Sequence, residues 1–241
     1  MHTKDTVLKQ VHAALEHEAR IALQNQRIEV DFDDGTLTLD GEVPNVGCKK
    51  RALEAAAAVS GVSGIIDRLH VTPAERLGDG AIRDAVCEHF LSDVDFHNCC
   101  LHSRAKGREE VLREMPTDTS GSIDVSVEDG VVTLTGQVIS LSHKRLAGLL
   151  AWWAPGCRDV VNGLEVVPPE DDNDDEITDA LRLVLETDPL VPADRIGIRS
   201  HDHVVTLEGV VSTQEEKTRA EQDAWCLFAV DKVINHIEVR I

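Results

Sequence analysis

The spacing of hydrophobic residues along this chain repeats three times: a helical spacing is followed by the alternating spacing of strands, in the same order each time. In the first copy, apolar residues recur every three to four positions over residues 7–23, as they do on one face of a helix. The period then falls to two over residues 28–43, in two stretches separated by Asp34-Gly35. This alternation predicts two half-buried β-strands joined by a tight turn.

The turn between the two alternating stretches has the same chemistry in each copy. Asp-Gly occupies positions 34–35 and 129–130, and Asp202-His203 occupies the third. A type I′ hairpin turn needs positive φ at both central residues, which favours Asp-Gly. Asp and His are among the few other residue types that tolerate this region. The sequence therefore predicts three hairpins.

A second helical pattern and a last apolar strand follow each hairpin. Small residues four apart, such as Ala52 and Ala56, would let the helix lie close to a sheet. Thr213 with Glu216 predicts a capping box at the start of the third copy of this helix. The helix between the last two strands predicts a right-handed parallel crossover. Each copy should therefore place two helices on a three-stranded mixed sheet.

The copies align without a gap from Ile28 to Val71, with the second and third copies displaced by 95 and then 73 residues. The repeated turn, glycine and polar positions are Gly35, Gly130 and His203; Gly41, Gly136 and Gly209; and Asp67, Asn162 and Asn235. We therefore predict an α/β (α+β) protein of three tandem modules. The predicted modules span residues 1–72, 79–167 and 174–241, with an insertion at about 92–122 in the second.

These motifs resemble the BON domain family, named for bacterial osmotically inducible and nodulation-related proteins. The third copy has Leu-Glu-Thr-Asp-Pro-Leu at 185–190, and the hairpins follow the pattern D-G-x-V-x-L-x-G-x-V. The last strands approximate the pattern G-V-x-x-V-x-N-x-L-x-V, with one or two substitutions in each copy. The resemblance implies a non-catalytic module associated with the bacterial envelope, osmotic stress, and phospholipid or protein contacts. It supplies no catalytic residues.

Charge and composition limit the classes of partner that this protein can bind. The chain carries 44 acidic and 24 basic residues, a net charge of −20, which argues against a nucleic-acid partner. Neither a signal-like apolar segment at the start nor an apolar run of spanning length is seen, so we expect a cytoplasmic protein. Its six cysteines are then expected to be thiols.

The insertion contains the densest group of metal-ligand residue types: His97, Cys99, Cys100 and His102. Four such ligands would have to converge to hold zinc. The spacing matches no known zinc knuckle, so the alternative is a loop with free thiols. We expect no bound cofactor.

The insertion also contains the one locally basic patch, Arg104, Lys106, Arg108 and Arg113. It could dock on an anionic membrane. Acidic residues at 109, 110 and 114 favour the alternative, a helix with neighbouring opposite charges.

Two sets of residues that occupy equivalent positions in the repeats, here called repeat columns, are also candidates for function. The column Asp67, Asn162 and Asn235 is a candidate repeated site, or a set of side chains that bond nearby backbone. Trp152 and Trp225 share a second column, and they would pack in a core or contact a partner.

Taken together, the sequence predicts a binding or scaffolding protein without a reaction centre. Its first expected mode is protein–protein contact, including self-association through unpaired strand edges. Phospholipid binding is the second and metal binding by the insertion is the third.

Overall fold

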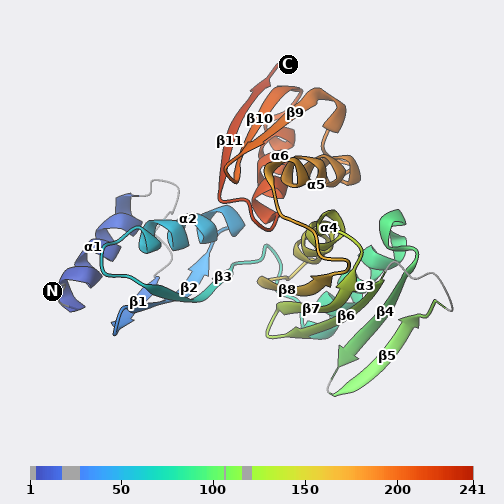
Figure 1. Cartoon of the computed structure of the whole chain (residues 1–241), viewed down its shortest axis with the longest axis horizontal. Helices are drawn as coiled ribbons and strands as arrows, with labels where there is room; N and C mark the ends of the chain where they lie inside the picture. Colours follow the sequence, from blue (N-terminus) through green and yellow to red (C-terminus); the bar gives the residue numbers. More distant parts are fainter. Residues whose placement is uncertain (1–3, 18–27, 106, 116–120, 241) are drawn as a thin grey trace. The chain divides into compact units, whose positions relative to one another are not determined.

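The structure is a computed structural model in which residues 4–17, 28–105, 107–115 and 121–240 are described. The chain forms two compact units, one ending at Pro73 and the other beginning at Ala74. The first unit holds one repeat, and the second holds two. Figure 1 shows helices lying against one side of the sheet in each repeat.

The first unit has the predicted order of elements. Its bounds are α1 (Lys4–His17), β1 (Glu29–Asp33), β2 (Thr36–Val43), α2 (Val46–Ala57) and β3 (Gly64–Val71). Strand β2 pairs antiparallel with β1 and parallel with β3, which makes the predicted crossover. The predicted first helix reached residue 23, and its part from residue 18 onwards lies outside the described residues.

The second unit contains the other two repeats. The second repeat consists of α3 (Asp79–Ser92), η1 (Val94–Phe96), β4 (Cys99–Ala105), β5 (Arg108–Arg113), β6 (Gly121–Glu128), β7 (Val131–Val138), α4 (Leu141–Trp152) and β8 (Asp159–Val166). The third consists of α5 (Asp174–Thr187), η2 (Ala193–Arg195), β9 (Ile196–His201), β10 (Val204–Val211), α6 (Gln214–Cys226) and β11 (Lys232–Val239). The third sheet has three strands in the order β11-β10-β9, as predicted.

The prediction for the insertion was wrong. Residues 99–113 form two strands rather than a charged helix, and the second sheet has five strands in the order β5-β4-β6-β7-β8 instead of three. Strand β4 runs parallel to β6 and antiparallel to β5. Its odd-numbered residues from Cys99 to Ser103 are buried and the residues between them are not, which is the period of a strand. The opposite charges of β5 therefore pair across strands rather than along a helix.

The three hairpin turns have the predicted backbone. Asp34 and Gly35 have φ of 43° and 83°, and Asp202 and His203 have 48° and 60°. A second glycine is required beyond each turn, as at Gly136 with φ of 120°. A Cβ there would lie 2.1 Å from the carbonyl oxygen of Ser122 on β6, so a side chain would disrupt the hairpin.

The repeats bury their apolar residues in two separate cores. One belongs to the first unit and includes Val7, Val11, Leu37 and Leu39. The second and third repeats share the other, because α4 packs against α5 and α6 as well as against its own sheet. No helix within the described residues is long and apolar enough to cross a membrane.

Candidate functional site

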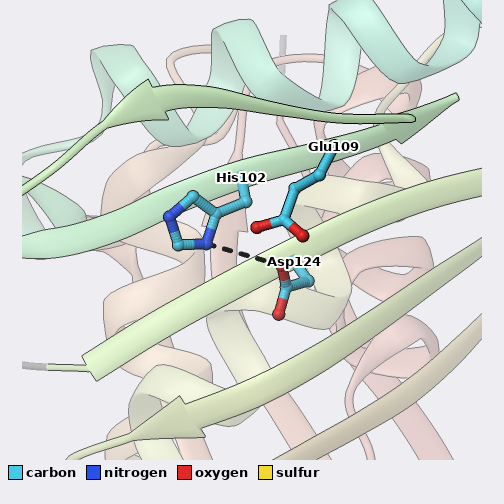
Figure 2. A group of neighbouring side chains, drawn as sticks. All are labelled: His102, Glu109 and Asp124. Carbon is cyan, nitrogen blue, oxygen red and sulfur yellow. Dashed lines mark ion pairs between the residues drawn. The ribbon is translucent and has the colours of Figure 1, made fainter.

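The helix-free face of the five-stranded sheet brings together one metal-ligand side chain from each of three neighbouring strands. Glu109 comes from β5, His102 from β4 and Asp124 from β6. His102 and Asp124 are register partners, and Glu109 lies opposite Arg104, two residues along β4. Figure 2 shows the imidazole and both carboxylates directed toward one another.

The donor atoms of these three residues lie within 4.8 Å of one another. His102 Nδ1 is 3.4 Å from Asp124 Oδ1, and the two side chains are only 17% and 24% exposed. Glu109 is 50% exposed, so its carboxylate remains movable. The site is thus open to solvent on one side and fixed by the sheet on the other.

A third carboxylate, that of Glu114, approaches the other side of the His102 ring. Glu114 Oε1 lies 3.3 Å from His102 Nε2, so each ring nitrogen faces a different carboxylate. Cys100, two residues earlier on the same face of β4, donates its thiol to Glu114 Oε2 at 3.7 Å. These contacts fix the orientation of the imidazole plane.

The four residues first considered as metal ligands do not converge. Cys99 is 1% exposed and packs in the shared core. His97 is exposed at the end of η1, whereas Cys100 and His102 point to the helix-free face. The alternative of a thiol-bearing loop is also wrong, because both cysteines lie on β4.

The basic patch is divided by acidic neighbours. Arg104 lies 3.7 Å from Glu109, and Arg108 is exposed beside Glu109 and Glu110. Lys106 lies outside the described residues. Arg113 instead donates to the carbonyl oxygens of Cys99 at 2.9 Å and Phe96 at 2.5 Å, which ties β5 to the turn before β4.

A second group of possible ligands, Asp174, His201 and Asp202, belongs to the fold of the third repeat. Asp174 accepts the backbone N–H groups of Asp202 at 2.9 Å and His203 at 3.1 Å. These bonds lower the pKa of the Asp174 carboxyl. Asp79 holds the hairpin turn of the second repeat in the same way, at 3.2 and 2.9 Å.

The polar column joins the last strand to the second helix of each repeat. Asn162 donates to the Lys144 carbonyl at 2.7 Å and accepts from the Leu164 N–H at 3.3 Å. Asn235 donates to the Lys217 carbonyl at 3.1 Å. Asp67 cannot donate; its carboxylate lies 3.0 Å from Lys49 Nζ and accepts from the Leu69 N–H at 2.9 Å. The lysines occupy one repeat position, so an ion pair in the first repeat replaces an amide bond.

The junction of the second and third repeats contains a buried arginine. Arg145 on α4 is 0% exposed, forms an ion pair with Asp172 and donates to the Phe228 carbonyl at 3.3 Å. A buried charge needs such partners. This contact therefore connects α4, the linker after β8 and the end of α6.

Two buried carboxylates that share one arginine also lie at the junction of the second and third repeats. Arg219 lies 2.5 Å from Asp188 and 3.9 Å from Asp223, with its guanidinium over the Trp153 ring at 5.5 Å. Trp153 Nε1 donates to Asp223 Oδ1 at 3.1 Å. Burial, with the neighbouring Asp188 charge, raises the pKa of Asp223 to about 7, despite the Trp153 bond and Arg219. Protonated Asp223 can donate to Asp188.

The two tryptophans of the repeat column have different environments. Trp225 is 4% exposed in the shared core, and Trp152 is half-buried against it. Trp153, which the sequence reasoning did not single out, makes a polar contact between the second and third repeats. Glu109 and Asp124 were also missed. The alternation of apolar and polar residues over 99–105 indicated a strand there, and a strand would have placed His102 next to residues of neighbouring strands.

Comparisons with known proteins place these features in a family. Osmotically-inducible protein Y of Escherichia coli (strain K12) is 28% identical over 127 residues, which cover 50% of this chain and 63% of that protein. The match therefore spans less than two thirds of the relative.

Two solved structures of CdsD, a structural protein of the Type III secretion system of Chlamydia trachomatis, align over 98% and 97% of this chain. They cover 98% and 92% of the CdsD chains, each at 14% identity, with TM-scores of 0.24 and 0.25. The BON domain profile matches residues 3–73, 104–168 and 173–241. These segments account for most of the chain, which therefore belongs to the BON domain family and carries three tandem copies of the domain.

Proposed function

We propose that this chain is a non-catalytic binding or scaffolding protein that works in stress or envelope physiology through contacts with other proteins. Membership of the BON family supports the absence of a reaction centre, because the repeated residues serve turns and packing. The similarity to an osmotically inducible protein supports the link to stress.

Exposed aliphatic side chains at one repeat position are the observation that carries the proposal. Ile66 on β3 is 45% exposed and Val161 on β8 is 52% exposed, on the faces that the helices leave open. Both are partners of threonines in register, Thr38 and Thr133. Burying such a side chain against a partner contributes about 1–2 kcal/mol, so two sheets can each offer a contact point.

The cysteines suit a reducing compartment. All six lie within the described residues, and no disulfide joins any two of them. Disulfides are common in exported proteins and rare in the cytoplasm. We therefore propose a cytoplasmic location, to be checked by cell fractionation with a tagged full chain.

Affinity capture with matched variants tests the protein-binding proposal. Ile66→Asp and Val161→Asp should each reduce recovery of a specific co-purifying protein at least about fivefold, because a charge replaces an apolar contact. Val94→Asp is the control, since Val94 is 71% exposed but lies in η1 rather than in a strand. Size-exclusion chromatography of the same variants separates a foreign partner from a second copy. Equal recovery with all four proteins would remove the proposal.

Phospholipid binding has less support. Arg104 is already paired with Glu109, and the chain carries a net charge of −20. Vesicles containing anionic lipid should therefore leave the protein in the supernatant at low salt. Co-sedimentation that salt abolishes would instead favour the membrane surface as the partner.

A further inference from the structure

We propose that Glu109, His102 and Asp124 form a binding site for a divalent transition-metal ion of the zinc class. The site lies on the helix-free face of the second repeat, on three adjacent strands (Figure 2). It goes beyond the protein-binding function proposed above and does not depend on it.

The donor set suits such an ion. One imidazole nitrogen and two carboxylate oxygens are common zinc ligands, and three protein ligands leave a coordination position for water or for a group from another molecule. Imidazole with carboxylates also accepts neighbouring first-row divalent metals. The site can therefore bind an ion without any thiolate.

The distances allow an ion with little rearrangement. Zinc–nitrogen and zinc–oxygen bonds of about 2.0–2.1 Å in a tetrahedron place two ligand atoms about 3.3 Å apart. His102 Nδ1 and Asp124 Oδ1 are already 3.4 Å apart. The third donor lies within 4.8 Å of both. Glu109 is half exposed, so rotation of its side chain can close the remaining gap.

Glu114 supplies the support that a metal-bound histidine normally has. A ring that binds metal through Nδ1 carries its proton on Nε2, and that N–H usually donates to a carboxylate or carbonyl. Nε2 of His102 lies 3.3 Å from Glu114 Oε1. The ring is thus held between a ligand carboxylate on one side and a supporting carboxylate on the other.

Charge also favours a cation here. Three carboxylates, those of Glu109, Asp124 and Glu114, surround the imidazole of His102. Arg104, 3.7 Å from Glu109, is the nearby cation that an incoming ion would displace. Removing Arg104 should therefore tighten metal binding, an effect that a purely structural role of the cluster does not predict.

The inserted strands make the site particular to the second repeat. Strands β4 and β5 supply two of its three ligands. In the third repeat the position of Asp124 is Gly197, and α5 leads to β9 without inserted strands. The third repeat of the same chain therefore cannot form this site.

The experiment is calorimetric titration of the reduced full chain with zinc chloride at neutral pH. One equivalent should bind. His102→Ala should weaken that binding at least about 100-fold, the isosteric Asp124→Asn at least about 10-fold, and Glu114→Gln about 10-fold as a supporting group. Arg104→Gln should tighten it severalfold. His201→Ala and His97→Ala are the matched histidine controls and should bind as the natural chain does.

Several results would overturn the proposal. These are the absence of zinc binding by the natural chain, binding that survives both His102→Ala and Asp124→Asn, or binding that Cys100→Ser abolishes and Asp124→Asn leaves intact. The last would identify a thiolate site. Circular dichroism of each variant confirms that a lost signal comes from the ligand and not from unfolding.

Discussion

Helices α2 and α4 occupy the same place in their repeats, yet one serves a single module and the other joins two. On α2, burial is confined to one side of the helix, at Ala52, Ala56 and residues 47–49. On α4, burial runs through Arg145–Ala151 without a break. A helix that is buried all round belongs in the interior of a larger core, and α4 packs against α5 and α6 of the third repeat.

A few positions account for this difference. Arg51, Glu54 and Ala55 of the first repeat correspond to leucines at 146, 149 and 150 in the second. The sheet-facing alanines are the same in both helices and are 0% exposed. The residues that define the fold are therefore shared between repeats, whereas the outward side of one helix decides which repeats associate.

Leu149→Glu should have the largest effect on this comparison. Leu149 is 0% exposed, and the substitution places at its position the charge that Glu54 carries in the first repeat. A buried unpaired carboxylate should destabilise the second unit by about 4 kcal/mol or more. Denaturant unfolding followed by tryptophan fluorescence reports this unit alone, because all three tryptophans lie in it.

The reverse substitution, Glu54→Leu, is the matched control. Glu54 is exposed, so the stability of the first unit, followed by circular dichroism, should change by less than about 0.5 kcal/mol. Equal losses in the two units would show that the outward side of α4 does not hold the second and third repeats together.

Asp223→Asn should give the next largest effect, and it should depend on pH. Its pKa is raised to about 7 in the folded protein, from an ordinary value of 3.8. Between these values the folded chain keeps a proton that the unfolded chain has lost, so stability falls as pH rises from about 4 to 7. Above pH 7, Asp223 is ionised in both the folded and the unfolded chain, so its effect on the free energy of unfolding stays constant and is at its most destabilising.

The amide imitates the protonated acid. Asparagine still accepts from Trp153 Nε1 and can donate to Asp188. At pH 8 the variant should therefore be more stable by on the order of 1–3 kcal/mol, and its profile between pH 4 and 7 should be flatter. Ser200→Ala in the same unit is a control that leaves the profile unchanged. A variant that is less stable at pH 8 would contradict the role of Asp223.

Exchanging Asp for Asn in the polar column of Asp67, Asn162 and Asn235, or Asn for Asp, should change the free energy of unfolding least among these predictions. Asn162→Asp removes the donor to the Lys144 carbonyl and should cost about 1–2 kcal/mol in the second unit. Lys144 cannot readily replace it, because its amine lies over the Phe228 ring at 5.3 Å. Asp67→Asn should stay within about 1 kcal/mol, since an amide can donate to the helix carbonyl of the first repeat as Asn162 does. Equal costs would mean that the column has one role throughout.

Much of the fold followed from the sequence because its signals are local. The Asp-Gly turns, the alternation on either side and the capping box at Thr213 act within a few residues, and the structure contains all three. The structure of the insertion could not be predicted because its signals are not local. Its charges fit the spacing of a helix as well as that of a hairpin, and the burial that decides between them comes from pairing with β6, whose partner residues follow 22 positions later.

The candidate metal site could be predicted only in part. His102 was among the residues considered, but Glu109 and Asp124 join it through the register of three strands. A register is set by the whole sheet and by its buried face, so ligand residues on the open face give no spacing of their own. The leucines of α4 were a local signal and could have indicated the junction of the second and third repeats.

Strand β5 also sets a limit on assembly. It forms the outer border of its sheet and bears Arg108, Glu109, Glu110 and Arg113 along only a few residues. A neighbouring chain that paired with β5 would have to remove water from these charged side chains, and this cost protects an edge strand against aggregation. The insertion therefore blocks pairing with another chain at the β5 edge. Strand β8, at the opposite edge, is the strand of this sheet that remains open to such pairing.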